Sequence, residues 1–145
     1  MRLLPKINIL SYSRMGTYKQ EYEAGKKSEE EVLPIITKYF NREIKASVGR
    51  YTRYDFEDSE YKYELKTRTN RYSQYPTTLL PLGKLIGDKN IFLFRFTDGL
   101  YFIQYNKELF DTFEVNEFVR NYRSDYNDQS TKHIFIPITN LTKIN

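Results

Sequence analysis

The chain has 145 residues, a net charge of +4, one histidine and no cysteine. The absence of cysteine excludes disulfides, thiolate zinc sites and cysteine nucleophiles, and the lone His133, which we expect to be structural, excludes a multi-histidine metal site. A chain of this length can bury its own core, so we expect one domain over residues 1–145. No apolar run approaches the roughly 20 residues of a membrane helix, and no secretion signal is legible. We therefore expect a soluble intracellular protein, cytoplasmic or nuclear, with no membrane partner and with a viral or phage origin left open.

The first predicted element is a helix over residues 27–41. Ser28 can cap it, and Glu31 three residues later completes a capping box. Glu29 is in phase with the apolar positions of this helix, which places it on the inward side. Capping alone would also explain the run of acids. Pro34 is awkward inside a helix, and a start a few residues later would accommodate it best.

Residues 49–68 predict a β-hairpin. The run 49–56 is rich in tyrosine and reads as a strand, and the polar residues 57–60 suit a turn. Residues 61–67 alternate strictly, as a half-buried strand requires, so that one face carries Lys62, Glu64, Lys66 and Arg68.

A turn centred between Ser59 and Glu60 would place Asp55 directly opposite Glu64, with Cβ atoms about 5 Å apart. Two carboxylates at that distance repel, and either protonation or a cation between them relieves the repulsion. Mg²⁺ needs only one or two protein carboxylates, and Lys66 projects to the same side. A solvated face of mixed charge is the alternative interpretation.

The later elements alternate between helices and strands. Residues 69–81 read as a loop, with a short helix starting near Thr77. We predict a central strand over 90–97, a two-residue Asp98-Gly99 turn, a return strand over 100–105, a helix over 107–122 and a last strand over 133–138. Pro137 indicates a sheet edge or a strand end. The order predicts an α/β or α+β fold on a mixed sheet.

Charge and aromatic residues suggest a nucleic-acid partner. Residues 65–86 contain no acid but four basic residues, Lys66, Arg68, Arg71 and Lys84. Such segregation suits a surface that meets a polyanion, although ordinary surface patchiness also produces it. Tyr72 lies among these arginines and could stack on bases, with packing in the core as the alternative.

The combination of a helix acid, Asp55 and Glu64-Leu65-Lys66 resembles the PD-(D/E)XK nuclease superfamily, which includes Holliday-junction resolvases and restriction endonucleases. The resemblance covers residues 28–105, and Tyr54 stands where the motif carries proline. It implies a restriction-endonuclease-like core, with a central mixed sheet flanked by helices.

The resemblance also implies roles for individual residues. Asp55, Glu64 and the backbone carbonyl of Leu65 would hold Mg²⁺, for which Mn²⁺ would substitute, and either Glu29 or Glu30 would supply the helix acid. Lys66 would orient the attacking water and offset charge on the phosphate. Four arginines flank this site and could contact neighbouring phosphates: Arg50, Arg53, Arg68 and Arg71.

The expected activity is therefore that of a Mg²⁺-dependent DNA endonuclease, with branched or recombination-intermediate DNA among its substrates and a homodimer as its implied assembly. Two alternatives stay open. The first is a nucleic-acid-binding or assembly protein on the same fold that no longer catalyses. The second is a structural protein whose tyrosine-rich surface makes protein contacts, with the charged hairpin merely solvated.

Overall fold

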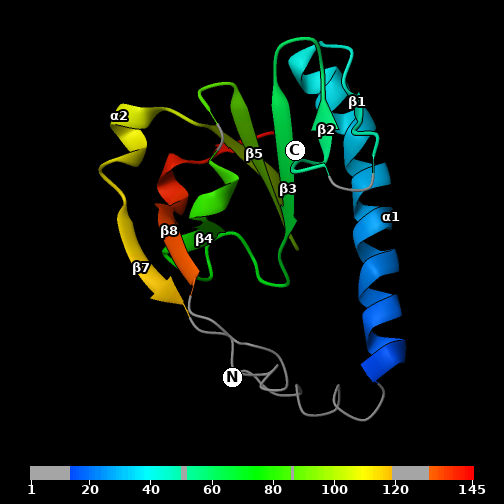
Figure 1. The fold of residues 1–145 in the computed structure, drawn as a ribbon, viewed down its shortest axis with the longest axis horizontal. Coiled ribbons are helices and arrows are strands. Elements are labelled where there is room, and N and C mark those ends of the chain that lie inside the picture. The colour runs from blue at the N-terminus through cyan, green and yellow to red at the C-terminus, as the bar shows by residue number, and fades with distance from the viewer. Residues whose placement is uncertain (1–13, 50–51, 86, 119–130) are drawn as a thin grey trace.

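The computed structural model describes residues 14–49, 52–85, 87–118 and 131–145, and these form three layers. The layers are the helix α1 (Arg14–Phe40), a six-stranded mixed sheet and a three-stranded sheet. In Figure 1, α1 stands on one side of the long strand β3, and the strands of the smaller sheet lie on the other. The prediction of an α+β fold with a mixed sheet is confirmed. Of the expected flanking helices, α1 covers one face of the larger sheet, while the three-stranded sheet lies on its other face.

The six-stranded sheet contains the hairpin. Its order is β1 (Lys45–Ala46), β2 (Phe56–Glu57), β3 (Lys62–Thr67), β5 (Asn90–Phe96), β6 (Gly99–Gln104) and β9 (Thr142–Lys143). β3 and β5 are parallel, while the other neighbouring pairs are antiparallel. A parallel pair requires a crossover connection. The crossover here contains β4 (Thr77–Pro81) and the 3₁₀ turn η2 (Leu82–Lys84).

The three-stranded sheet has the order β4, β8 (Thr131–Pro137) and β7 (Glu114–Phe118), with antiparallel pairing throughout. Two short helical segments complete the described fold, α2 (Lys107–Phe110) and η3 (Ile138–Asn140). Pro137 ends β8, in agreement with the predicted strand end, although β8 is the central strand of its sheet. His133 is buried within β8 and not at its start.

Two hydrophobic clusters separate the layers. One lies between α1 and the larger sheet and includes Val32, Ile36, Tyr63, Leu65 and Leu93. The other lies between the two sheets and includes Leu80, Phe92, Phe94, Ile134 and Ile136. Consecutive residues of β3 and β5 therefore face different layers, which makes both strands buried on both sides. Glu64 is consequently buried rather than solvated.

Helix α1 is 27 residues long and begins well before the predicted start. Its first half lacks an apolar stripe, so periodicity gave no signal there, and residues 19–24 are exposed in the structure. Glu, Gln, Lys and Ala favour helix without needing a buried face. Ser28 lies inside the helix, so the predicted capping box is wrong. None of the helices in the described part of the chain has the length and hydrophobicity that crossing a bilayer requires.

Three other predicted elements differ from the structure. Of the described residues in the predicted strand 49–56, only Phe56 lies in a strand, β2 (Phe56–Glu57), and residues 50 and 51 lie outside the described ranges. The helix predicted near Thr77 is the strand β4. The helix over 107–122 ends at Phe110 and gives way to β7; residues 119–122 lie outside the described residues. Two adjacent threonines in β4 favour extended backbone, since β-branched side chains pack well on a pleated surface. The strand over 90–97 and the hairpin after it are confirmed, with Thr97-Asp98 as the turn.

Candidate active site at the β2–β3 fork

The register of the β2–β3 hairpin brings the predicted residues together. Phe56 pairs with Tyr63 and Glu57 with Lys62. The N–H of Asp55 continues this ladder by donating to the carbonyl of Tyr63 at 2.9 Å. Asp55 therefore stands opposite Glu64, and the turn is centred where the sequence places it.

Past this point β2 no longer covers the edge of β3. Lys62 and Arg68 each use their N–H to bond carbonyls on the β5 side, at 3.1 Å and 2.8 Å. Because these directions alternate along a strand, the N–H and carbonyl of Leu65 face the opposite edge. There, Oδ2 of Asp55 accepts a hydrogen bond from the Leu65 N–H at 2.8 Å. The Asp55 side chain thus takes the place of a neighbouring strand, and the Leu65 carbonyl opens toward the same edge.

The place where β2 and β3 separate, marked by Asp55, Glu64 and Leu65, is called the fork below. Glu29 is the acid of α1 that lies near it. It is half-buried, whereas Glu30 and Glu31 are exposed. Burial, followed by the negative charge of Asp55 and a hydrogen bond with it, raises the pKa of Glu29 to about 7, and Lys26 opposes the shift. Near neutral pH the Glu29 carboxyl group is therefore partly protonated.

The rotation of α1 that turns Glu29 inward is fixed by a buried polar contact. Ser28 Oγ lies 2.8 Å from Thr67 Oγ1 on β3, and Arg95 donates to Ser28 Oγ at 3.2 Å. The same guanidinium forms an ion pair with Glu31 at 2.8 Å. Ser28 and Glu31, which the sequence suggested as capping residues, instead bind the middle of α1 to the sheet.

Glu64 lies on the other face of the sheet, beneath two lysines. The amines of Lys66 and Lys84 each lie 3.4 Å from the same oxygen, Glu64 Oε2. Burial and the charge of Asp55 raise the pKa of Glu64, while both lysines oppose the shift. The sequence predicted Lys66 here, but gave no signal that Lys84 would join it, because the η2 turn reaches the site only through the crossover.

The donor set fits a hard divalent cation by its chemistry. Carboxylate and carbonyl oxygens of Glu29, Asp55, Glu64 and Leu65 are the ligand types that Mg²⁺ prefers. Within the described ranges, however, no three acidic, histidine or cysteine side chains stand in an arrangement that would hold a metal ion. Glu29 and Glu64 approach from opposite faces of the sheet, and lysines occupy Glu64. The four candidate ligand residues are thus neighbours, but their side chains would have to move toward one another to bind one ion.

The predicted phosphate-contacting residues have different fates. Arg71 is exposed, and Arg50 lies outside the described residues. Arg53 donates to the carbonyl of Gly83 at 2.8 Å, close to Lys84 in sequence. Arg53 therefore connects the segment before Asp55 to the η2 turn.

Two of the predicted nucleic-acid contacts are corrected by the structure. Arg68 is half-buried, donates to Leu79 O and Thr78 Oγ1, and lies over the ring of Phe94; its removal from solvent lowers its pKa. Tyr72 stacks on Tyr101 with ring centroids 4.0 Å apart and donates its hydroxyl to the Ile138 carbonyl. Both side chains hold the two sheets together and are not free to meet a nucleic acid in this conformation.

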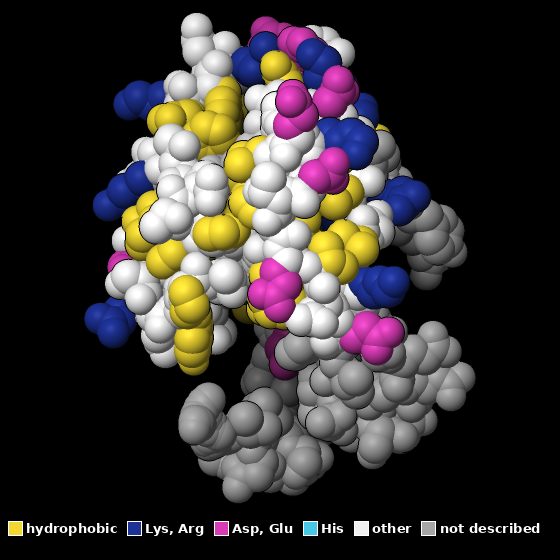
Figure 2. All heavy atoms as spheres, turned by 90° about the vertical axis from the view of Figure 1, so that its left-hand side faces the viewer, with side chains coloured by type: hydrophobic (Ala, Val, Ile, Leu, Met, Phe, Trp, Pro, Cys, Tyr) yellow, Lys and Arg dark blue, Asp and Glu magenta, His cyan; other side chains and the backbone are white. Residues whose placement is uncertain are grey.

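Surface shape adds two observations. A hollow of about 650 Å³, lined in part by Arg42, Glu57 and Asp58, lies at the turn end of the hairpin, away from the fork. Figure 2, seen from the side of the smaller sheet, shows the Lys and Arg side chains of the described residues spaced around the edge of that face. No basic patch on that face of the described structure therefore competes with the fork.

No protein-family model, curated protein or solved structure matches the chain.

Proposed function

We propose that this chain is a Mg²⁺-dependent DNA endonuclease of the PD-(D/E)XK type. The observation that carries the proposal is the fork itself: Asp55 stands opposite Glu64 and bonds Leu65 N–H, while Lys66 contacts Glu64. This proximity of two carboxylates, one backbone carbonyl and one lysine supports the proposal. Branched DNA belongs to the proposed substrates, and a homodimer, testable by light scattering, to the proposed assembly.

The proposed ligands are the carboxylates of Asp55 and Glu64, the Leu65 carbonyl and the carboxylate of Glu29. A bound Mg²⁺ supplies positive charge that stabilises a phosphate under attack and favours hydroxide near neutral pH. Mn²⁺ would serve the same purpose. Glu29 must lose its proton to act as a ligand, because a neutral carboxyl group is a poor one for a hard cation.

Lys66 has the position required of a charge-stabilising group. The amine of Lys66 lies beside Glu64. The Lys66 side chain is one quarter exposed, so it could reach a phosphate bound at the fork. An ammonium at this place would hold the attacking water by hydrogen bonding and offset the negative charge that develops on the phosphate oxygens. Asp55 and Glu64, both acceptors, would orient that water.

The direct test measures cleavage of labelled linear duplex, single-stranded and four-way-junction DNA by the full chain. We expect cleavage with Mg²⁺ or Mn²⁺, none with EDTA, and none with Asp55→Asn. Lys143→Met provides a matched control, because Lys143 is an exposed lysine on β9, at the far edge of the larger sheet. Intact substrates under all of these conditions would contradict the proposal.

One observation favours a second candidate, a nucleic-acid-binding protein without catalysis. Lys66 and Lys84 already contact Glu64, the pKa of Glu29 is raised, and no three of the described acids converge. Salt-dependent DNA binding that Asp55→Asn leaves unchanged, with no cleavage by the wild type, would support this candidate. Loss of cleavage in Asp55→Asn would exclude it.

A further inference from the structure

Two lysines converge on one buried carboxylate oxygen at the fork. Each amine lies 3.4 Å from Glu64 Oε2, so the two nitrogens are at most twice that distance apart. The Glu64 side chain is only 10% exposed, while those of Lys66 and Lys84 are 25% and 33% exposed. The carboxylate is therefore less exposed than the two lysine side chains, both of which reach the solvent.

The chain holds Lys84 in this place from several directions. β4 pairs with β8, and Arg68 adds hydrogen bonds from β3 to Thr78 and Leu79. Arg53 then holds Gly83, the residue next to Lys84, through its carbonyl. The segment that leads into Lys84 is therefore held in place before any ligand binds, and a preorganised segment loses less conformational freedom on binding, which favours affinity.

The two amines outnumber the one carboxylate that they contact, although the charge of Asp55 also acts on this cluster. Two ammonium groups share one carboxylate, and the hydrogen-bonding capacity of each ammonium exceeds what a single shared oxygen can accept. If Glu64 turned to a cation or lost its charge, both amines would be released together. Two lysines less than about 7 Å apart can then donate to the oxygens of one phosphate group.

We propose that Lys66 and Lys84 form a two-lysine phosphate-binding pair for a nucleic-acid strand, which Glu64 holds closed and a divalent cation at Glu64 opens. The role of the cation rests on the proposed function. Phosphate binding by the pair does not, because neutralising Glu64 by substitution opens the pair without any metal or cleavage. Lys84 thereby becomes a second substrate-contacting lysine, provided by the crossover and absent from the motif.

The test measures binding of a fluorescein-labelled 20-base single-stranded DNA to the full chain by anisotropy, in EDTA. Glu64→Gln keeps the shape of the side chain and removes its charge. We expect it to bind at least about fivefold more tightly than the wild type, since one or two lysines become available to phosphates. Adding Lys84→Met should remove most of this gain, whereas Lys84→Arg should keep it.

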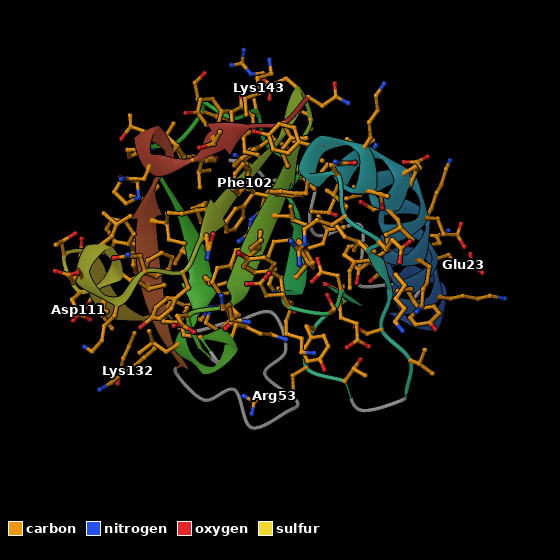
Figure 3. All side chains as sticks on the ribbon, turned by 90° about the horizontal axis from the view of Figure 1, so that it is seen from above. Glu23, Arg53, Phe102, Asp111, Lys132 and Lys143 are labelled. Carbon is orange, nitrogen blue, oxygen red and sulfur yellow. The ribbon has the colours of Figure 1, made fainter. Side chains whose placement is uncertain are left out.

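A control separates the pair from general electrostatics. Loss of any acidic charge favours DNA binding slightly, and that effect should be additive with loss of a distant lysine. Lys143→Met serves here, because in Figure 3 Lys143 and Arg53, which holds the Lys84 segment, lie on opposite sides of the molecule. We expect Glu64→Gln to gain as much affinity in the Lys143→Met background as in the wild type. Circular dichroism checks that each variant is folded.

The outcomes distinguish this inference from the nuclease proposal. An equal gain from Glu64→Gln with Lys84 present or replaced by Met would overturn the lysine pair, whether or not the chain cleaves DNA. A gain that depends on Lys84, in a protein that never cleaves, would retain the pair and reject the nuclease. In a cleaving protein, Mg²⁺ should tighten DNA binding to wild type more than to Lys84→Met; an equal effect would remove the opening role of the cation.

Discussion

The carboxylate of Asp55 bonds the backbone N–H of Leu65 at 2.8 Å, at the point where β3 loses its neighbouring strand. This contact turns the end of a hairpin into a place where side-chain and main-chain oxygens face one another. It also leaves Asp55 close to Glu29, whose pKa is raised to about 7 by burial first and then by the charge of Asp55.

The raised pKa of Glu29 predicts a stability change with pH. A carboxyl group whose pKa is higher in the folded state favours folding when protonated, and this contribution declines as pH rises from about 4.5 to about 7. Glu29→Gln should therefore raise the free energy of unfolding at pH 8 by about 1 kcal/mol, allowing for solvent screening of a half-exposed group, and change it little at pH 4. Urea denaturation at both pH values measures this. Equal effects at the two would contradict it.

Lys66→Met is predicted to separate catalysis from binding. Loss of a charge-stabilising group should lower kcat by on the order of 100-fold or more, while the DNA dissociation constant rises by less than about tenfold, since one of several phosphate contacts is lost. Single-turnover cleavage and anisotropy measure the two quantities. A proportional loss of both would show that Lys66 only binds DNA.

Arg68 and Arg71 should behave differently although they are three residues apart. Arg68 is half-buried and hydrogen-bonded to β4, so Arg68→Met should lower the free energy of unfolding by about 2 kcal/mol, because two acceptors in β4, one of them on the buried Thr78, lose their donor. Arg71 is exposed, and Arg71→Met should leave stability within about 0.5 kcal/mol. Denaturation curves of both variants measure this difference. Similar losses in the two would contradict the different environments assigned to Arg68 and Arg71.

Asp58 is predicted to stabilise the hairpin turn most strongly above the acid range. Burial raises its pKa, but hydrogen bonds from Arg42, Tyr63 and two backbone N–H groups outweigh burial and bring the pKa well below its usual range. Its contribution is therefore present above about pH 4 and lost as pH falls further. Asp58→Ala should cost about 2 kcal/mol at pH 7 and clearly less at pH 2.

Tyr63→Phe is the matched control for Asp58→Ala. It removes one hydrogen bond to Asp58 and keeps the buried ring, so a cost of about 1 kcal/mol is expected at pH 7. Thermal denaturation of both variants at pH 2 and pH 7 gives the comparison. A cost for Tyr63→Phe equal to that of Asp58→Ala would mean that Arg42 and the two backbone N–H groups contribute nothing.

The parts of the fold that could be predicted are those with local signals. Alternation in 61–67 and the apolar run 90–96 each fix an element from nearby residues, and the Asp55–Glu64 register follows from turn length alone. The Asp98-Gly99 signal finds the hairpin but places its turn one residue late, since Gly99 already pairs with Phe96. Glu29 could be chosen over Glu30 by helix phase. These inferences need no knowledge of the rest of the chain.

Other features depend on distant segments and could not be predicted locally. β4 exists because β8 pairs with it, and Lys84 reaches Glu64 because β4 leads into η2. Arg68 looked available to phosphate, since nothing near it in sequence shows that Leu79 will cover it. The first half of α1 has no apolar stripe, so its helical state had no periodic signal.

The route of the chain through the crossover has a consequence for the order of folding. β4 precedes β5 in the chain, yet Thr77 pairs with Pro137, which follows both β5 and β6. Pairing between strands so far apart in the sequence requires a loss of chain entropy, so we expect β4 and β8 to pair late. During synthesis, the hairpin with Asp55, Glu64 and Lys66 can therefore assemble before Lys84 is anchored. A chain stopped before residue 131 would keep the contact of Lys66 with Glu64 but lack the support that holds Lys84 there.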